Sequence, residues 1–171
     1  MRLPDKMENY HAIERATARI APTNENIQIV PLAKEHIDAI VKIENESFGD
    51  PWSKKLFDDL LVNDYAVSFA AVESTEIAGY LIAYDLITEI QILNIAVKES
   101  KRRGKIATKL FDAIFDYAKS NEIEEFTLEV RPSNIGAIAF YKKLGFKIDG
   151  VRKNYYKNPK EDAVLMSLRL L

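Results

Sequence analysis

The sequence predicts a mixed α/β fold in which helices flank a central, mostly antiparallel sheet. Two strand-like runs, Tyr65 to Val72 and Ile77 to Leu86, are joined by a short polar segment, and a third from Glu89 to Val97 follows closely, as in an antiparallel meander. A helical pattern from Ile106 to Ser120 then leads into a strand from Phe126 to Val130. This β-α-β order requires a parallel crossover within the sheet.

The N-terminal elements follow from hydrophobic spacing. A first strand, Ile27 to Leu32, precedes a helix that ends near Phe48 and Gly49. The next helix is expected to contain Pro51 early, with Ser53 as a candidate N-cap. Its predicted apolar face consists of Trp52, Leu56, Phe57, Leu60 and Leu61.

The C-terminal part is predicted to close the sheet with a hairpin. A helix from Ile135 to Leu144 is stopped by Gly145. The hairpin strands run from Phe146 to Tyr155 and from Ala163 to Leu170, with a turn through Asn158 and Pro159.

Length and composition indicate one globular domain. The chain has 171 residues, 47% of them hydrophobic and 29% charged, which suits a domain with a full core. We expect this domain to span residues 26–171, and residues 1–25 to form an N-terminal extension. A monomer or a weak homodimer is expected.

Several functional classes are disfavoured by what the sequence lacks. Cysteine is absent, which excludes disulfides, thiolate metal sites and a cysteine acyl-enzyme. The two histidines, His11 and His36, lack metal-ligand spacing, so no metal is expected. No apolar run approaches the ~20 residues of a membrane span, and the first residues do not resemble a signal peptide. These features predict a cytoplasmic protein without a membrane partner.

A basic turn lies between the Glu89 to Val97 strand and the helix that starts at Ile106. Six lysines or arginines and one glutamate lie between Lys98 and Lys109, although the net charge of the chain is −2. Unpaired N–H groups at a helix start suit a phosphate group, and Gly104 would let the backbone approach it. From spacing alone, a solvated basic loop is equally possible, because neither common nucleotide-binding glycine motif is present.

The residues of this turn carry a family resemblance that continues along the chain. The R-R-G-K-I-A from Arg102 to Ala107 resembles the acetyl-coenzyme A loop, Q/R-x-x-G-x-G/A, of the GNAT superfamily of N-acetyltransferases, although Lys105 stands where the family usually has glycine and Gly104 lies one position earlier. The segments L-E-V-R-P-S-N (128–134) and A-I-A-F-Y-K-K-L-G-F (137–146) are similar to those of protein N-terminal acetyltransferases. N-Y-Y (154–156) and E-D-A (161–163) resemble the final hairpin of the RimI-type enzymes and their archaeal relatives.

This resemblance covers roughly residues 27–170 and implies the GNAT fold, acetyl-coenzyme A as cosubstrate and a protein N-terminus as acceptor. The acetyl group would pass by direct attack in a ternary complex. The implied coenzyme contacts are Ile95, Ala96, Val97, Arg102, Arg103, Gly104, Lys105, Ile106, Ala107, Thr108, Asn134 and Tyr141.

Glu129 and Tyr141 are the candidate catalytic residues. Strand alternation places Glu129 on the face opposite Leu128 and Val130, as a lone carboxylate among apolar neighbours. A surface glutamate paired with Arg131 is the alternative from spacing, whereas the resemblance implies a general base. The His that archaeal relatives often carry on the preceding strand is replaced by Gln91.

Tyr141 fits a core aromatic on a helix face, and the resemblance implies that it protonates the departing thiolate. Asn134 could cap the same helix and also contact the coenzyme.

The acceptor peptide is expected to meet aromatic residues and one acid. The candidates are Phe48, Asp50, Pro51, Trp52, Tyr155 and Tyr156, although plain core or surface aromatics are an equal alternative for each. Two other functions remain open. One is a small-amine or lysine acetyltransferase of the same fold, and the other is a non-catalytic module that binds acyl-coenzyme A or nucleic acid. The resemblance implies that the paired tyrosines contact peptide backbone, which favours a peptide acceptor over a small amine. Glu129 and Tyr141 disfavour a pure binding module, so no nucleic-acid partner is expected.

Overall fold

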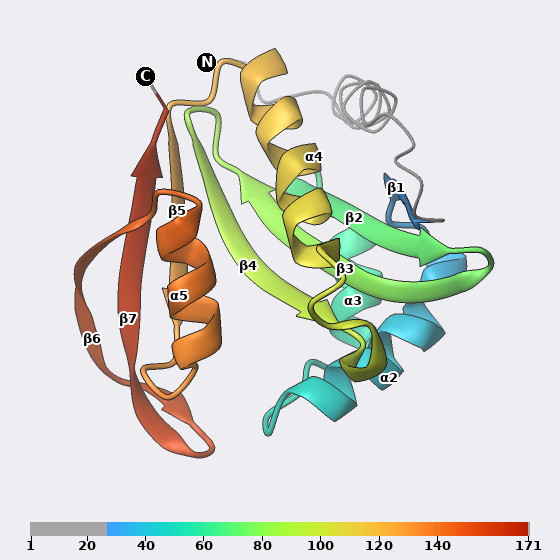
Figure 1. Ribbon diagram of the computed structural model, residues 1–171, viewed down its shortest axis with the longest axis horizontal. Helices are drawn as coiled ribbons and strands as arrows, with labels where there is room; N and C mark the ends of the chain where they lie inside the picture. Colours follow the sequence, from blue (N-terminus) through green and yellow to red (C-terminus); the bar gives the residue numbers. More distant parts are fainter. Residues whose placement is uncertain (1–26, 171) are drawn as a thin grey trace.

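Seven strands form one sheet in the order β1-β2-β3-β4-β5-β7-β6 in the computed structural model, which describes residues 27–170 (Figure 1). The neighbouring strands β4 and β5 pair in parallel, and the other five neighbouring pairs are antiparallel. The elements are β1 (Ile27–Pro31), η1 (Lys34–His36), α2 (Ile37–Ser47), α3 (Lys54–Leu61), β2 (Ala66–Glu73), β3 (Glu76–Asp85), β4 (Glu89–Val97), η2 (Glu99–Lys101), α4 (Ile106–Ser120), β5 (Glu125–Val130), α5 (Ile135–Lys143), β6 (Lys147–Lys157) and β7 (Lys160–Arg169).

The predicted fold class is confirmed, and one helix start is wrong. Helix α3 begins at Lys54, so Pro51 and Trp52 precede it and lie in an extended connection. Ser53 is its N-cap, as predicted, and its side chain accepts a hydrogen bond from the Leu56 N–H. The predicted N-terminal extension lies outside the described residues.

Two hydrophobic clusters hold the sheet between its helices. The larger cluster joins α4 and α5 to the central and C-terminal strands, with Phe111, Tyr117 and Phe126 fully buried. The smaller cluster packs α2 and α3 against β3 and β4 around Ile40 and Phe57. The sheet is therefore rigid on both faces around its middle strands.

Strand β4 carries a bulge and then separates from β5. Ile82 of β3 pairs with Asn94 and Ala83 pairs with Ile92, so Leu93 is an extra residue in β4. Pairing between β4 and β5 extends only to Ile92 and its partner Leu128, although both strands continue (Figure 1). One edge of β4 beyond Ile92 therefore has no strand partner in β5.

Gly79 of β3 allows the close approach of the C-terminal part of β4. A Cβ at Gly79 would lie 2.8 Å from the backbone oxygen of Ala96, a distance that real Cβ atoms do not adopt. The Ala96 carbonyl belongs to backbone, so it cannot move aside without shifting β4. Gly136 in α5, by contrast, has nothing within 4 Å of its Cβ position.

We predict that Gly79→Ala lowers the free energy of unfolding by about 1–3 kcal/mol, because the added methyl overpacks a rigid backbone contact. The matched control Gly136→Ala should raise it by about 0.5–1 kcal/mol, because alanine is the better helix former. Urea denaturation measures both values. Equal stabilities for the two variants would contradict the close approach.

Candidate active site

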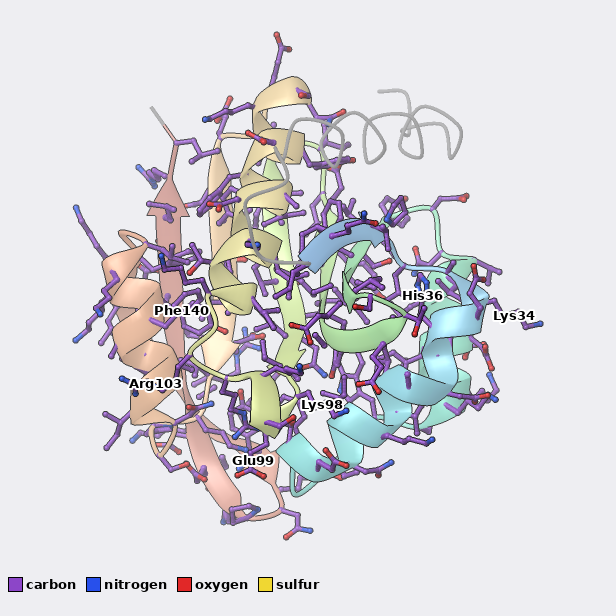
Figure 2. The ribbon with its side chains drawn as sticks, turned by 45° about the vertical axis from the view of Figure 1, so that its right-hand side comes forward. Lys34, His36, Lys98, Glu99, Arg103 and Phe140 are labelled. Carbon is purple, nitrogen blue, oxygen red and sulfur yellow. The ribbon has the colours of Figure 1, made fainter. Side chains whose placement is uncertain are left out.

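A cavity of about 290 Å³ lies at the end of β4 beside the N-terminus of α4. It adjoins the part of β4 that β5 does not pair with, which contains Ile95, Ala96 and Val97. Its lining residues are Val97, Arg102, Arg103, Lys105, Ile106, Ala107, Thr108 and Phe140. The structure thus brings together seven of the residues that the resemblance implied for the coenzyme, and it adds Phe140 of α5. Arg103 and Phe140 are labelled in Figure 2.

The N-terminus of α4 is open to a ligand. Helices α3 and α5 are capped by the side chains of Ser53 and Asn134, whereas the first residue before α4, Lys105, provides no side-chain cap. The first backbone N–H groups of a helix need acceptors from outside it. Because Ile106, Ala107 and Thr108 line the cavity, these N–H groups and the helix dipole favour an anion there.

The backbone of the loop differs from the expectation for Gly104. Arg103 and Lys105 have φ angles of 67° and 60°, in the left-handed region, whereas Gly104 does not have a positive φ. Glycine is the residue that adopts this region without strain, and Lys105 occupies the position where the family usually has it. A Cβ at Gly104 would lie 3.2 Å from the Lys101 oxygen, which is a tight contact with backbone.

The basic side chains of the loop have different roles. Lys101 forms an ion pair with Glu73 of β2, which holds the loop against the sheet. Arg102 donates from Nε to the Val97 oxygen at 3.1 Å and from Nη2 to Ser47 Oγ at 3.4 Å. Arg102 therefore links the cavity to the C-terminal end of α2.

Glu129 lies on β5 in a charged setting. It does not lie among apolar neighbours, because Arg152 Nη1 donates to its Oε1 at 2.7 Å and the Tyr155 hydroxyl lies 3.5 Å from Oε2. Arg131, the partner proposed from spacing, instead bonds Glu161 and two carbonyls of the β6–β7 turn. Arg152 reaches Glu129 from β6 across β7, and Arg131 reaches Glu161 of β7 and the turn before it. Neighbouring positions in the sequence indicate neither contact.

Tyr141 is buried within the cluster of α4 and α5. Its ring packs against Phe111 and Phe146, with ring centroids 5.9 and 5.8 Å apart. Burial raises the pKa of its hydroxyl above the usual value, and the neighbouring Tyr156 contributes to this. The hydroxyl therefore stays protonated at neutral pH. Asn134 caps α5, since its side chain accepts from the Ala137 N–H at 3.1 Å.

The two segments that carry the acceptor candidates, far apart in sequence, approach each other at Gly49 and Asn158. The connection after α2 contains Phe48, Asp50, Pro51 and Trp52, and a Cβ at Gly49 would lie 3.8 Å from the Asn158 oxygen of the β6–β7 turn. The rings of Tyr155 and Tyr156 in the same hairpin lie 5.0 Å apart. The Arg131 guanidinium lies over the Tyr156 ring at 4.1 Å. Burial raises the Tyr156 pKa to about 12.

Glu44 is a site residue that the sequence analysis missed. It is buried on α2, and its carboxylate accepts hydrogen bonds from the Trp52 N–H at 2.9 Å, from the Tyr80 hydroxyl and from the Asn94 amide. Burial raises its pKa despite these bonds. Glu44 lies four residues after Ile40, so the helical spacing in the sequence already indicates that it is on the buried face of the helix. Glu44 fixes the connection before α3 to the β4 bulge.

Among residues 27–170, no group of three or more histidine, cysteine, aspartate or glutamate side chains could hold a metal ion. In the same part of the chain, none of the helices has both the length and the apolar character needed to cross a membrane.

Comparison with known proteins identifies the family. The model of the acetyltransferase (GNAT) family matches residues 37–146, which form most of the fold and the loop of the cavity. The chain therefore belongs to the acetyltransferase (GNAT) family and is an N-acetyltransferase.

Individual members of the family are similar to this chain over most of its length. The [ribosomal protein bS18]-alanine N-acetyltransferase of Escherichia coli is 31% identical over 142 residues, covering 82% of this chain and 95% of that protein. Its crystal structure has a TM-score of 0.78 and covers 84% of this chain and 93% of that chain at 30% identity. A Bacillus subtilis protein provisionally named for the same activity is 38% identical over 133 residues, which cover 77% of this chain and 88% of that protein.

A structure of Ard1 from Thermoplasma volcanium is also similar, with a TM-score of 0.79 and 27% identity over 85% of this chain and 99% of that chain. These likenesses confirm the predicted membership among RimI-type and archaeal relatives.

We predict that the left-handed backbone at Lys105 favours glycine. The free energy of unfolding of Lys105→Gly should equal that of the wild type or be up to about 1 kcal/mol higher. The free energy of unfolding of Lys105→Val should be about 1–2 kcal/mol lower than that of the wild type. Thermal or urea denaturation measures both. A Lys105→Val variant as stable as Lys105→Gly would contradict the assigned conformation.

Proposed function

We propose that this protein transfers the acetyl group of acetyl-coenzyme A to the free α-amino group of a protein N-terminus. The observation that carries this proposal is the uncapped α4 N-terminus beside the edge of β4 that β5 leaves unpaired. Glu129 directly follows Leu128, the last residue of β5 that pairs with β4, and the Tyr155 hydroxyl lies beside it. The likeness to bS18-alanine N-acetyltransferases supports a ribosomal protein as the acceptor class. A cytoplasmic location and the absence of a nucleic-acid partner remain predictions.

The residues around the cavity fit acetyl-coenzyme A. The N–H groups of Ile106, Ala107 and Thr108 and the side chains of Arg102 and Arg103 would hold its phosphates. Backbone groups of Ile95, Ala96 and Val97 would pair with its extended arm, as an added strand pairs with a sheet edge. Asn134 and Tyr141 would contact the arm from α5. When bound, the coenzyme supplies the acetyl group as a reactive thioester.

Side chains of the protein would accept the proton of the amine and donate a proton to the leaving sulfur. An α-amino group has a pKa near ~8, so a carboxylate such as Glu129 can accept its proton directly or through water. The protonated Tyr141 hydroxyl would donate to the leaving sulfur. Because the chain has no cysteine, we propose direct transfer in a ternary complex.

The acceptor would bind between the connection after α2 and the β6–β7 hairpin. Phe48, Pro51 and Trp52 would contact the first side chain, and Asp50 would attract the amine. Tyr155 and Tyr156 would bond the peptide backbone, which a small-amine substrate would not require.

The assay that tests this proposal measures mass and thiol release with acetyl-coenzyme A and two peptide sets. One set has free N-termini beginning Ser, Ala, Met-Leu or Met-Glu, and the other has blocked N-termini and an internal lysine. We expect acetylation of the first set alone. Acetylation of the lysine set alone would favour the alternative lysine chemistry, and acetylation of neither set would favour a small amine.

A pair of substitutions separates chemistry from coenzyme binding. We expect Glu129→Gln to lower kcat by about 10²-fold or more while the KM for acetyl-coenzyme A changes little, because a general base contributes this much. Gly104→Val should do the reverse, since its Cβ would press on the Lys101 oxygen and distort the loop.

Steady-state kinetics with the best peptide measures these effects. Glu125→Gln is the matched control, because Glu125 lies four residues earlier on the same strand and pairs with Arg169. Unchanged turnover in Glu129→Gln would remove Glu129 from the role of base.

A further inference from the structure

The carboxylate proposed to receive the acceptor amine already holds a cation of the protein. Arg152 Nη1 lies 2.7 Å from Glu129 Oε1, and the same guanidinium lies 5.2 Å from the centre of the Tyr155 ring. The Tyr155 hydroxyl, 3.5 Å from Oε2, completes the group. A cationic N-terminus that approaches Glu129 must therefore meet Arg152.

The sheet register explains how Arg152 reaches Glu129 across an intervening strand. Glu129 of β5 pairs with Leu165 of β7, and Ala163 of β7 pairs with Arg152 of β6. Directly paired residues, and residues two apart on one strand, share a face, so Arg152 and Glu129 lie on the same side of the sheet. Ala163 has only a methyl group, and the long arginine side chain can cross β7 above it.

The pair is asymmetric in exposure. The Arg152 side chain is 54% exposed and the Glu129 side chain is 16% exposed. A half-exposed ion pair is weak because water screens it and because a long side chain must be held still. The partly buried Glu129, by contrast, gains from any well-placed cation. Arg152 is thus the more exposed partner and the one that a second cation can displace into water.

We propose that Arg152 competes with the acceptor, because its guanidinium occupies the amine position at Glu129 until the α-ammonium group of an acceptor displaces it. This inference rests on the proposed function, because it requires the amine to approach Glu129. An N-terminus that carries no positive charge, such as an acetylated one, cannot take the guanidinium's place.

The test is equilibrium titration of an acetylatable peptide into enzyme saturated with coenzyme A, so that no turnover occurs. We expect Arg152→Gln to lower the peptide Kd by about two- to fivefold, the range that a partly exposed ion pair allows. The KM for acetyl-coenzyme A should not change. Arg152→Lys keeps a cation and should bind the peptide nearly as the wild type does.

Lys153→Gln is the matched control, because Lys153 is the next residue of β6 and pairs with Asp162 rather than Glu129. It should leave the peptide Kd unchanged. A peptide Kd that is unchanged or higher in Arg152→Gln would overturn the inference. That result is expected if Arg152 only supports the fold or contacts the peptide, because removing such an arginine cannot tighten peptide binding. If the wild type acetylates no free N-terminal peptide, the proposed function itself fails, and the two failures are thereby distinguished.

Discussion

The separation of β4 from β5 after Ile92 and Leu128 is the constraint on which the rest of the site depends. Two parallel strands that stayed paired would satisfy each other's backbone groups and leave no edge for a ligand. The extra residue Leu93 turns β4 away at this point. Gly79 then lets the end of β4 lie close against β3, so β4 is held on one edge and open on the other.

The remaining elements of the site converge on this opening. Helix α4 presents its uncapped N-terminus at the end of β4, and α5 contributes Phe140 to the lining of the cavity. Glu44 connects the proposed acceptor side to β4, because its hydrogen bonds join Trp52 to Asn94, which directly follows the bulge residue. One stretch of β4 therefore contacts both the proposed coenzyme side and the proposed acceptor side.

Periodic features of the sequence predicted the fold well. The bounds of β4 and α4 agree with the structure, since an apolar strand run and a complete helical face mark both ends. The start of α3 was wrong because the Glu44 carboxylate, eight residues away, holds the Trp52 N–H outside the helix. The partner of Glu129 was wrong because Arg152 lies 23 residues away and reaches it only through the register of β6 on β7. Contacts of this kind depend on tertiary geometry, whereas the basic loop, Glu129 and the tyrosines were proposed from motifs.

The most direct test of this account is amide hydrogen exchange with and without acetyl-coenzyme A. Ligand binding should slow exchange at the first residues of α4, Ile106, Ala107 and Thr108, and at those N–H groups between Leu93 and Val97 of β4 that do not face β3. These N–H groups would gain partners from the ligand. The control strand β2, whose neighbours β1 and β3 pair with both of its edges, should show no change. Protection confined to other elements, with none at β4 or the start of α4, would contradict the assignment of the opening as the coenzyme site.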